Sequence, residues 1–209
     1  MSADLSHVPT GGPVADPSAA PLRARGTRSR AGNAMGRTRA AVLDGAARAV
    51  EKYGSRRTTM GDIAALAGIA KATVYNHFRT KGDVYRAALD AAVLDLGHEC
   101  AALARTNLAE ALVFAADRVG GHPALRRVAT EEPAVLAAFL TPGDGGTWRS
   151  VRSAAADLLN AAGRDAGAGS VDTVVRWVSS HAAAPGSGHT VAVGAEVLAA
   201  GLPRRPTPE

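Results

Sequence analysis

The sequence predicts an all-α fold, and three observations favour it. Alanine is abundant along the 209 residues, aromatic residues make up only 4%, and apolar residues recur at helical spacing through most of the chain. Alanine is the best helix former and allows helices to pack closely. The stretch 171–178 is rich in β-branched residues, but nothing near it could pair as a strand, so we expect a helix there too.

Charge is distributed unevenly along the chain. Residues 1–86 hold 14 Lys or Arg against 6 Asp or Glu, whereas residues 87–209 hold 10 against 13. A basic front half and a slightly acidic back half indicate that only the front meets a polyanion. Six of the arginines lie between Arg23 and Arg39, so a basic tail alone can also account for the excess.

Composition and periodicity divide the chain into four segments. Residues 1–36 are rich in Pro, Gly, Ala and Ser and have no apolar period, which predicts a disordered tail. Its arginines either attract phosphates without sequence preference or only keep the chain soluble. We expect a compact head over 37–82, a helical body over 83–203 and a second tail over 204–209.

Helix signals mark the limits of each element. A helix is predicted over 37–53, and Thr59 can cap a second helix, which Gly68 ends. A third, short helix is expected over 71–77. A capping box at residues 80–83 opens a long fourth helix. Looser periodicity predicts further helices near 108–119, 125–128, 133–140, 148–163, 171–183 and 190–201.

The most informative pattern lies in residues 59–78, where two short helices meet in a tight turn. Gly68 occupies the turn, because glycine adopts a positive φ without steric penalty. Ala64 lies where a larger side chain would collide with the second helix. The pattern predicts a helix-turn-helix, in which the second helix enters the major groove of DNA.

The second of these helices can be divided into faces at about 100° per residue. Val74 and Phe78 face inward, and Ala72 and Asn76 lie opposite them. Asn76 can hydrogen-bond an adenine edge, and a methyl of Ala72 or Thr73 can meet a thymine methyl. The remaining candidates are better placed for DNA phosphates. Among them, Thr59 is also a helix cap, and His77 is compatible with an ordinary surface position. The residues expected at DNA are Arg39, Thr59, Lys71, Ala72, Thr73, Tyr75, Asn76, His77 and Lys81.

The run from Arg39 to about Leu89 resembles the N-terminal domain of TetR-family repressors. The motifs that carry the resemblance are Ile63-Ala64 with Ala67-Gly68-Ile69, then Thr73-Val74-Tyr75-Asn76-His77-Phe78, then Lys81 with Val84. They cover about a quarter of the chain. Two positions depart from the family pattern: Ala70 often has a capping Ser or Thr, and Val50 is often aromatic.

The resemblance implies a homodimeric regulator that binds double-stranded operator DNA through its head, and the excess of arginine over lysine, 21 to 3, with frequent alanine indicates a GC-rich bacterial genome. The resemblance also implies a fourth helix that couples the head to a dimerising, effector-binding body, and release of a repressor from DNA by an unknown small-molecule effector. The dimer helices would be about 148–163 and 171–183, or 190–201. The body has few residues for a protein of this kind, which argues against a large ligand cavity. The candidate lining residues are Phe114, Arg118, Phe139, Trp148 and Trp177, each of which is also compatible with ordinary core packing.

Several other classes of protein and site find little support. The single cysteine, Cys100, excludes an internal disulfide and is typical of a reducing cytoplasm. There is no run of eighteen apolar residues, so we expect no membrane helix. His98 and Cys100 are two residues apart and so point to different faces of a helix, and we expect neither metal nor cofactor.

The sequence leaves three alternatives. The first is a DNA-binding regulator whose body binds a protein partner or has no ligand, which the short body favours. The second is a nonspecific DNA coater that uses only the basic tail. The third is an enzyme, for which no phosphate loop, Ser/His/Asp set or paired carboxylate site stands out; we interpret Glu131 and Glu132 as solvated or as helix-start charges.

Overall fold

The computed structural model describes residues 25–143 and 145–205, with side chains from Ala34 onward. The chain divides into two compact units, Met1–Arg37 and Thr38–Glu209. The described part of the first unit is the beginning of a helix. The account that follows concerns the second unit unless a residue before Thr38 is named.

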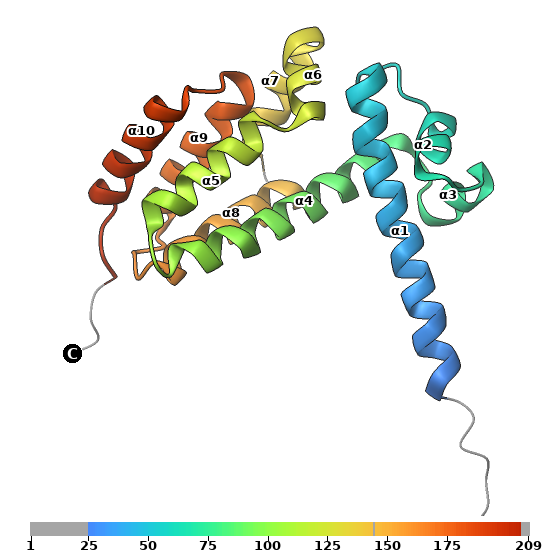
Figure 1. Ribbon diagram of the computed structural model, residues 1–209, viewed down its shortest axis with the longest axis horizontal. Helices are drawn as coiled ribbons and strands as arrows, with labels where there is room; N and C mark the ends of the chain where they lie inside the picture. Colours follow the sequence, from blue (N-terminus) through green and yellow to red (C-terminus); the bar gives the residue numbers. More distant parts are fainter. Residues whose placement is uncertain (1–24, 144, 206–209) are drawn as a thin grey trace, which may run out of the picture. The chain divides into compact units, whose positions relative to one another are not determined.

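Ten helices form the described part of the chain, and no strand occurs there beyond a single bridge between Arg164 and Arg204. The helices follow one another as in Figure 1. No helix in these ranges is long and apolar enough to cross a membrane. In chain order they are α1 (Arg25–Tyr53), α2 (Met60–Ala67), α3 (Lys71–His77), α4 (Lys81–Ala104), α5 (Leu108–Gly120), α6 (Pro123–Glu131), α7 (Pro133–Leu140), α8 (Gly146–Ala161), α9 (Ala168–Ala183) and α10 (Gly188–Gly201).

The head is formed by α2 and α3 packed on the C-terminal part of α1 and the start of α4. A core of small and medium side chains holds these helices together, because each presents one apolar stripe to the others. The buried members are Val42, Ala46, Ala49, Met60, Ile63, Ala64, Val74, Phe78 and Val84.

Two helices of the head approach each other closely at Gly45 of α1. A Cβ atom on this glycine would lie 2.8 Å from the backbone nitrogen of Ala67 and 2.8 Å from the carbonyl oxygen of Ile63. Because these are backbone atoms, they cannot move aside as a flexible side chain would. Glycine is therefore what allows α1 and α2 to pack at this distance.

The start of α1 differs from the prediction. The helix begins at Arg25, whereas order was predicted only from Arg37, so the predicted disordered tail does not extend over 25–36. Extending an existing helix is easier than nucleating a new one, so the helix continues without an apolar stripe, although three glycines in residues 25–36 disfavour it. The rest of the predicted tail, residues 1–24, lies outside the described residues.

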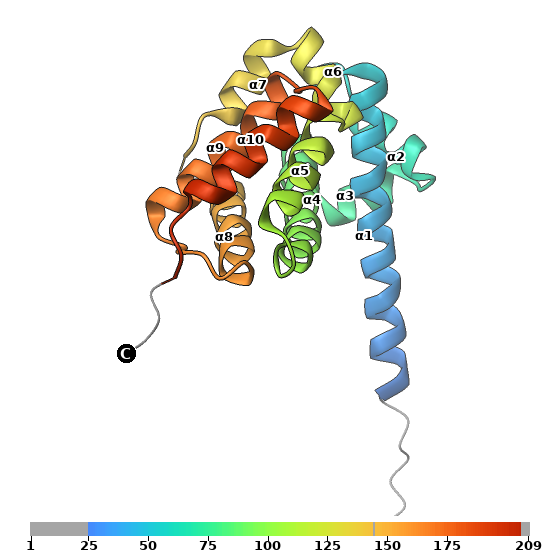
Figure 2. The same ribbon diagram turned by 60° about the vertical axis from the view of Figure 1, so that its left-hand side comes forward.

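The body is organised around α5, which packs against α4, α9 and α10 (Figure 2). Ala111 and Leu112 of α5 are fully buried there. The most extensive helix–helix contact is between α4 and α8. A Cβ on Gly97 would lie 2.8 Å from the Cβ of Ala154 there. The helix predicted over 171–178 is confirmed, since these residues lie in the middle of α9.

The end of the body extends further than predicted. The sequence predicted a tail from 204, but the backbone nitrogen of Arg205 donates to the carbonyl of Gly163 (3.1 Å), and that of Asp165 donates to Pro203 (2.9 Å). The guanidinium of Arg164 also donates to the carbonyl of Leu202 (2.8 Å). These hydrogen bonds fasten residues 203–205 to the α8–α9 turn.

Candidate nucleic-acid interface

The joint between α2 and α3 has the geometry that the sequence predicted. Thr59 and Asp62 form a capping box: the threonine backbone N–H and hydroxyl both donate to the carboxylate (2.8 and 2.7 Å), and the hydroxyl accepts from the Asp62 backbone (3.2 Å). At the other end of α2, Gly68 has φ +68° and its N–H returns to the carbonyls of Ala64 and Ala65. The left-handed glycine therefore ends α2 and redirects the chain into α3.

Hydrogen bonds at the start of α2 also fix the charge of Asp62. The hydroxyl and backbone N–H of Thr59 stabilise the ionised carboxylate and hold its pKa below its ordinary value. A negative charge in the first turn is favourable because the helix dipole is positive there. The same arrangement recurs at α4, where Thr80 and Asp83 form the predicted capping box.

The two faces of α3 are confirmed. Val74 is fully buried and Phe78 nearly so, whereas Ala72, Tyr75 and Asn76 are exposed. Thr73 and His77 lie half-buried at the edges of this surface. The exposed face, which we call the α3 face, thus presents an amide, a phenol and a methyl group on a short, rigid helix.

Basic side chains flank the α3 face. The Nζ atom of Lys71 lies 6.0 Å from the centre of the Tyr75 ring, and both residues are exposed. The exposed guanidinium of Arg39 lies over the Phe78 ring, 4.8 Å from its centre. Cations at these positions can contact DNA phosphates while α3 meets base edges.

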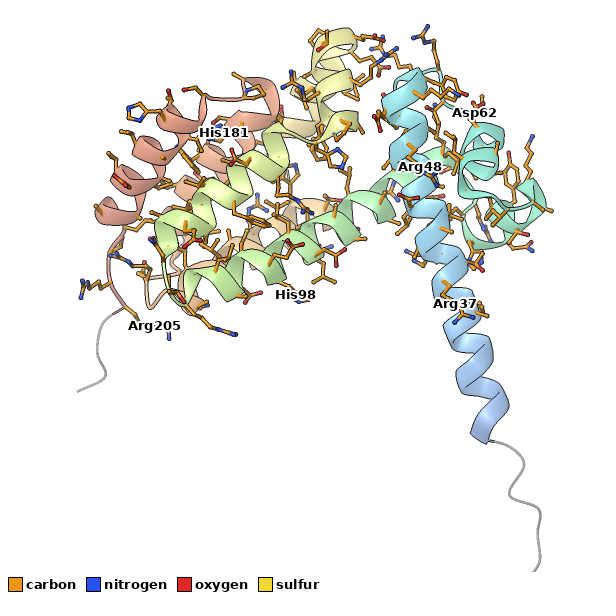
Figure 3. All side chains as sticks on the ribbon, in the orientation of Figure 1. Arg37, Arg48, Asp62, His98, His181 and Arg205 are labelled. Atoms are coloured by element: carbon orange, nitrogen blue, oxygen red, sulfur yellow. The ribbon has the colours of Figure 1, made fainter. Side chains whose placement is uncertain are left out.

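A contact that the sequence did not reveal fastens α1 to the end of α2. The guanidinium of Arg48 donates to the carbonyl of Leu66 (2.6 Å) and pairs with Asp44 (2.7 Å). Figure 3 shows Arg48 on α1 beside the helix that carries Asp62. Only the i,i+4 spacing of the acid and the arginine was visible in the sequence.

Residues 42–88, which include this joint and the α3 face, match the family described as "Bacterial regulatory proteins, tetR family". Over this segment the chain is similar to the tetR family. The match confirms the resemblance inferred from the motifs between Arg39 and Leu89.

The relatives agree with this assignment over the same segment. Two proteins of Pseudomonas putida are 45% identical over 53 residues: the HTH-type transcriptional regulator TtgR, and the probable HTH-type transcriptional regulator ArpR. The alignment covers 25% of this chain, which spans 25% of the length of each relative. Among solved structures, the fatty acid degradation regulator FadR from Bacillus halodurans is 16% identical, with a TM-score of 0.46 over 80% of this chain and 97% of that chain.

One position in this segment departs from the tetR-family pattern, and the structure shows the consequence. Ala70 precedes α3 and makes no side-chain capping hydrogen bond. The backbone N–H groups of the first turn of α3 therefore lack the partner that a Ser or Thr would supply. The helix depends more strongly on the packing of Val74 and Phe78 for its stability.

Lys81 has a different role from the predicted phosphate contact. Its Nζ atom donates to the carbonyls of Ser55, Arg56 and Thr58, at 2.9, 3.0 and 2.8 Å. An ammonium group has three donors, and all three are used here. The hydroxyl of Tyr85 donates to Ser55 as well (3.0 Å). Both residues of α4 thus hold residues 55–58, which we call the α1–α2 link.

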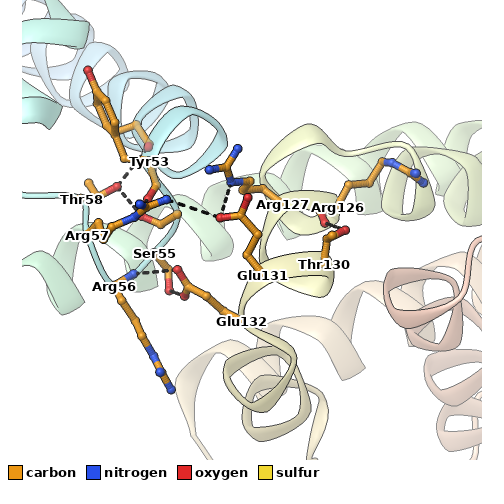
Figure 4. Close-up of polar contacts among 12 residues, drawn as sticks. Tyr53, Ser55, Arg56, Arg57, Thr58, Arg126, Arg127, Thr130, Glu131 and Glu132 are labelled. Carbon is orange, nitrogen blue, oxygen red and sulfur yellow. Dashed lines mark hydrogen bonds and ion pairs between the residues drawn. The ribbon is translucent and has the colours of Figure 1, made fainter.

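The body holds the α1–α2 link from another side (Figure 4). Glu132, between α6 and α7, accepts from the hydroxyl of Ser55 and from the backbone N–H of Arg56 (3.1 Å). Although desolvation opposes ionisation, these hydrogen bonds hold the pKa of Glu132 below its ordinary value. Gly54 permits the approach, since a Cβ there would lie 2.5 Å from the carboxylate.

A neighbouring acid adds ion pairs to this contact. Glu131 lies 3.5 Å from Arg57 of the α1–α2 link and 2.9 Å from Arg127 of α6. Glu131 is exposed and Glu132 directly precedes α7, as the interpretation of solvated or helix-start charges predicted, but both also contact the α1–α2 link, which lies far away in the sequence. We call the contacts of Glu131 and Glu132 with Ser55, Arg56 and Arg57 the carboxylate clamp.

The five residues predicted to line an effector cavity divide among different neighbours. The rings of Phe139 and Trp148 lie 6.4 Å apart, Arg118 lies exposed over the ring of Phe114, and Phe114, Trp148 and Trp177 pack against the body core. Trp148 alone among them lines a small recess, of about 200 Å³. Aromatic side chains at helical spacing fill the core here, as ordinary packing predicts.

The described residues contain no group of three His, Cys, Asp or Glu that could hold a metal ion. Cys100 is buried in the body core, and burial raises the pKa of its thiol to about 11. The thiol therefore behaves as a small apolar group.

Proposed function

We propose that this chain is a sequence-specific DNA-binding transcriptional regulator that acts as a repressor. One observation carries the proposal: a glycine-redirected pair of short helices buries Val74 and Phe78 and leaves the α3 face exposed. A helix of this kind fits the major groove, with its N-terminal residues at base edges. The tetR-family match over residues 42–88 supports the same function.

In this proposal Asn76 reads an adenine edge, and Ala72 and Thr73 contact thymine methyl groups. Lys71, Tyr75, His77, Thr59 and Arg39 position the head on the phosphates. Asn76 and Tyr75 are both exposed, which supports their assignment. Lys81 acts indirectly, by holding the α1–α2 link in place.

The regulator acts as a homodimer, because a palindromic site requires two heads about one helical turn apart, roughly 34–36 Å. Among the helices proposed for the interface, α10 carries the most apolar outer surface. Val193 and Val197, one turn apart, are 45% and 69% exposed. The outer surface of α9 instead carries the ion pair between Asp172 and Arg176. We therefore place α10 at the centre of the dimer interface.

An effector releases the repressor by favouring a head orientation that no longer matches both half-sites. A coupling of about 1–3 kcal/mol would lower the affinity for the operator some 5–150-fold. A second candidate is a regulator whose body takes no small molecule or binds a protein. The small size of the recess at Trp148 favours that candidate.

Selection of bound duplexes from a random pool tests the proposal. We expect a palindrome with half-sites about one turn apart, and Asn76→Ala should relax the preference at one position of each half-site by about 1–3 kcal/mol. A chain that lacks residues 1–30 should keep the preference, which separates this proposal from a tail-driven coater. Equal affinity for scrambled and selected duplexes would overturn it.

A further inference from the structure

A surface groove of about 810 Å³ runs along α4, between it and α8 on one side and α1 on the other. Apolar side chains, among them Leu43, Phe78 and Leu94, form much of its wall. We call it the α4 groove. Its lining includes Ala87, Asp90, Leu94 and Gly97 of α4, with Ala154 and Asp157 of α8.

The charges that line the α4 groove are not balanced. Asp83 is paired with Arg86 at 3.1 Å, and Arg39 already lies over the Phe78 ring. Asp90 has a buried carboxylate oxygen, Oδ1, that accepts no hydrogen bond from the described part of the chain. Asp157 adds an exposed negative charge. Counted together, Arg39 and Arg86 face Asp83, Asp90 and Asp157, with His98 also in the lining, so the groove has one negative charge in excess beside an apolar wall when the histidine is neutral.

A buried carboxylate oxygen without a donor is unfavourable, because that atom has lost water and gained nothing in exchange, although Asp90 as a whole is half-buried. A ligand that brought a positive charge near Asp90 would reduce that penalty by Coulomb attraction. The apolar wall would at the same time bury the carbon skeleton of the ligand, as in most small-molecule sites. At the α4–α8 side of the groove an anion would be repelled by Asp90 and Asp157, because Arg86 is paired with Asp83 and Arg39 lies on α1.

We propose that the α4 groove binds a small organic cation with an apolar body, whose charged group pairs with Asp90. This inference rests on the proposed function, because it assigns the chemical class and the site of the effector. The groove is lined by Arg39 and Leu43 of α1 as well as by α4 and α8. A ligand in it contacts head and body together, so its affinity depends on the orientation of the head.

Two ions of the same shape and opposite charge test this site. Calorimetric titration of the full chain compares tetraphenylphosphonium with tetraphenylborate. We expect the phosphonium to bind at least about tenfold more tightly, as one favourable charge contact implies. Asp90→Asn should weaken phosphonium binding about tenfold. Asp95→Asn is the matched control, since Asp95 is exposed on the same helix outside the groove, and it should bind as the wild type does.

A second variant guards against misfolding of the first. Leu94 is 56% exposed, so Leu94→Lys should fold, and its positive charge should also weaken phosphonium binding. Equal binding of both ions, or unchanged phosphonium binding by Asp90→Asn, would overturn the proposal. The proposal would also be overturned if either variant changed the mass of the assembly and left phosphonium affinity unchanged. That result would mean that a second copy of the chain covers the groove.

Operator binding, measured without the phosphonium, separates this inference from the function on which it rests. If the chain binds its selected duplex but binds no phosphonium through Asp90, only the cation-site proposal is rejected. If phosphonium binds through Asp90 but no duplex is preferred, the cation site is supported and the proposed regulator function is rejected. If both bind, added phosphonium should lower operator affinity, and an unchanged affinity would remove the effector role from the groove.

Discussion

At Cys100, burial in the body core determines how a single thiol behaves. Only the thiolate reacts with alkylating reagents, and a pKa of about 11 leaves very little of it at neutral pH. We expect N-ethylmaleimide at pH 8 to label the native chain at least about a hundredfold more slowly than the urea-unfolded chain. Mass spectrometry of timed samples measures this. Rapid labelling of the native chain would instead support a redox-sensing thiol.

At Gly45, the spacing between α1 and α2 leaves no room for a methyl group. Gly45→Ala should lower the free energy of unfolding by about 1–3 kcal/mol, because backbone atoms of α2 must shift to admit the Cβ. Urea unfolding followed by circular dichroism measures this. Gly36→Ala, in the same helix but with nothing within 4 Å of the added atom, is the control. It should cause no loss, since alanine favours the helix.

At Ala70, a missing cap can be restored. Ala70→Ser should raise the stability of the head by about 1 kcal/mol, because the hydroxyl can accept from a backbone N–H in the first turn of α3, which has no side-chain cap. The backbone of Ala70 is extended, with φ −66° and ψ 140°, as a capping residue requires. Ala65→Ser, at an exposed position inside α2, should give no gain in the same unfolding measurement. A lower free energy of unfolding for Ala70→Ser would show that the serine makes no cap.

Among the elements, the α1–α2 link depends most clearly on one side chain. Lys81→Met removes all three donors that hold the carbonyls of this link, and it should lower the free energy of unfolding by about 1–3 kcal/mol. The salt dependence of operator binding gives a second measurement. Because Lys81 is occupied within the protein, the slope of log affinity against log salt should not change. If Lys81→Met reduced this slope by about 1, the result would support the original prediction that Lys81 contacts a DNA phosphate.

The boundaries of the helices in the head could be predicted because they depend on local signals. Gly54, Gly68 and the two capping threonines act within a few residues of the helix ends that they determine. The exposed face of α3 followed from the spacing of Val74 and Phe78 alone. The sequence could not reveal the start of α1 at Arg25, because extending a helix requires no signal of its own.

Contacts between distant elements could not be predicted in this way. Glu132 meets Ser55, 77 residues earlier, and no local pattern marks that pairing. Lys81 was predicted at a phosphate because an exposed lysine at a helix start suits that role, and only its three carbonyl partners show otherwise. The α4 groove likewise combines residues of α1, α4 and α8, so its charge balance appears only once the chain is folded.

For the whole molecule, the proposed dimer can be tested at α10. Val197→Asp should place a charge in the interface and convert the dimer to a monomer, as light scattering after gel filtration would measure. Thr173→Asp, on the exposed surface of α9, is the matched control and should leave the mass unchanged. The monomer should also lose most of its operator affinity, since one head contacts only half of a palindrome. An unchanged mass for Val197→Asp would place the interface elsewhere.

The α1–α2 link is fastened twice, by Lys81 and Tyr85 of α4 and by the carboxylate clamp at the α6–α7 junction. Contacts on two sides keep the α1–α2 link from moving by small amounts. It moves only when the contacts from α4 or the carboxylate clamp break. Mild strain in the body therefore leaves the head where it is, and stronger strain frees it in a single step. Single molecules should therefore show a held head or a released head with little in between, while the fraction of released molecules follows the dose of the effector continuously.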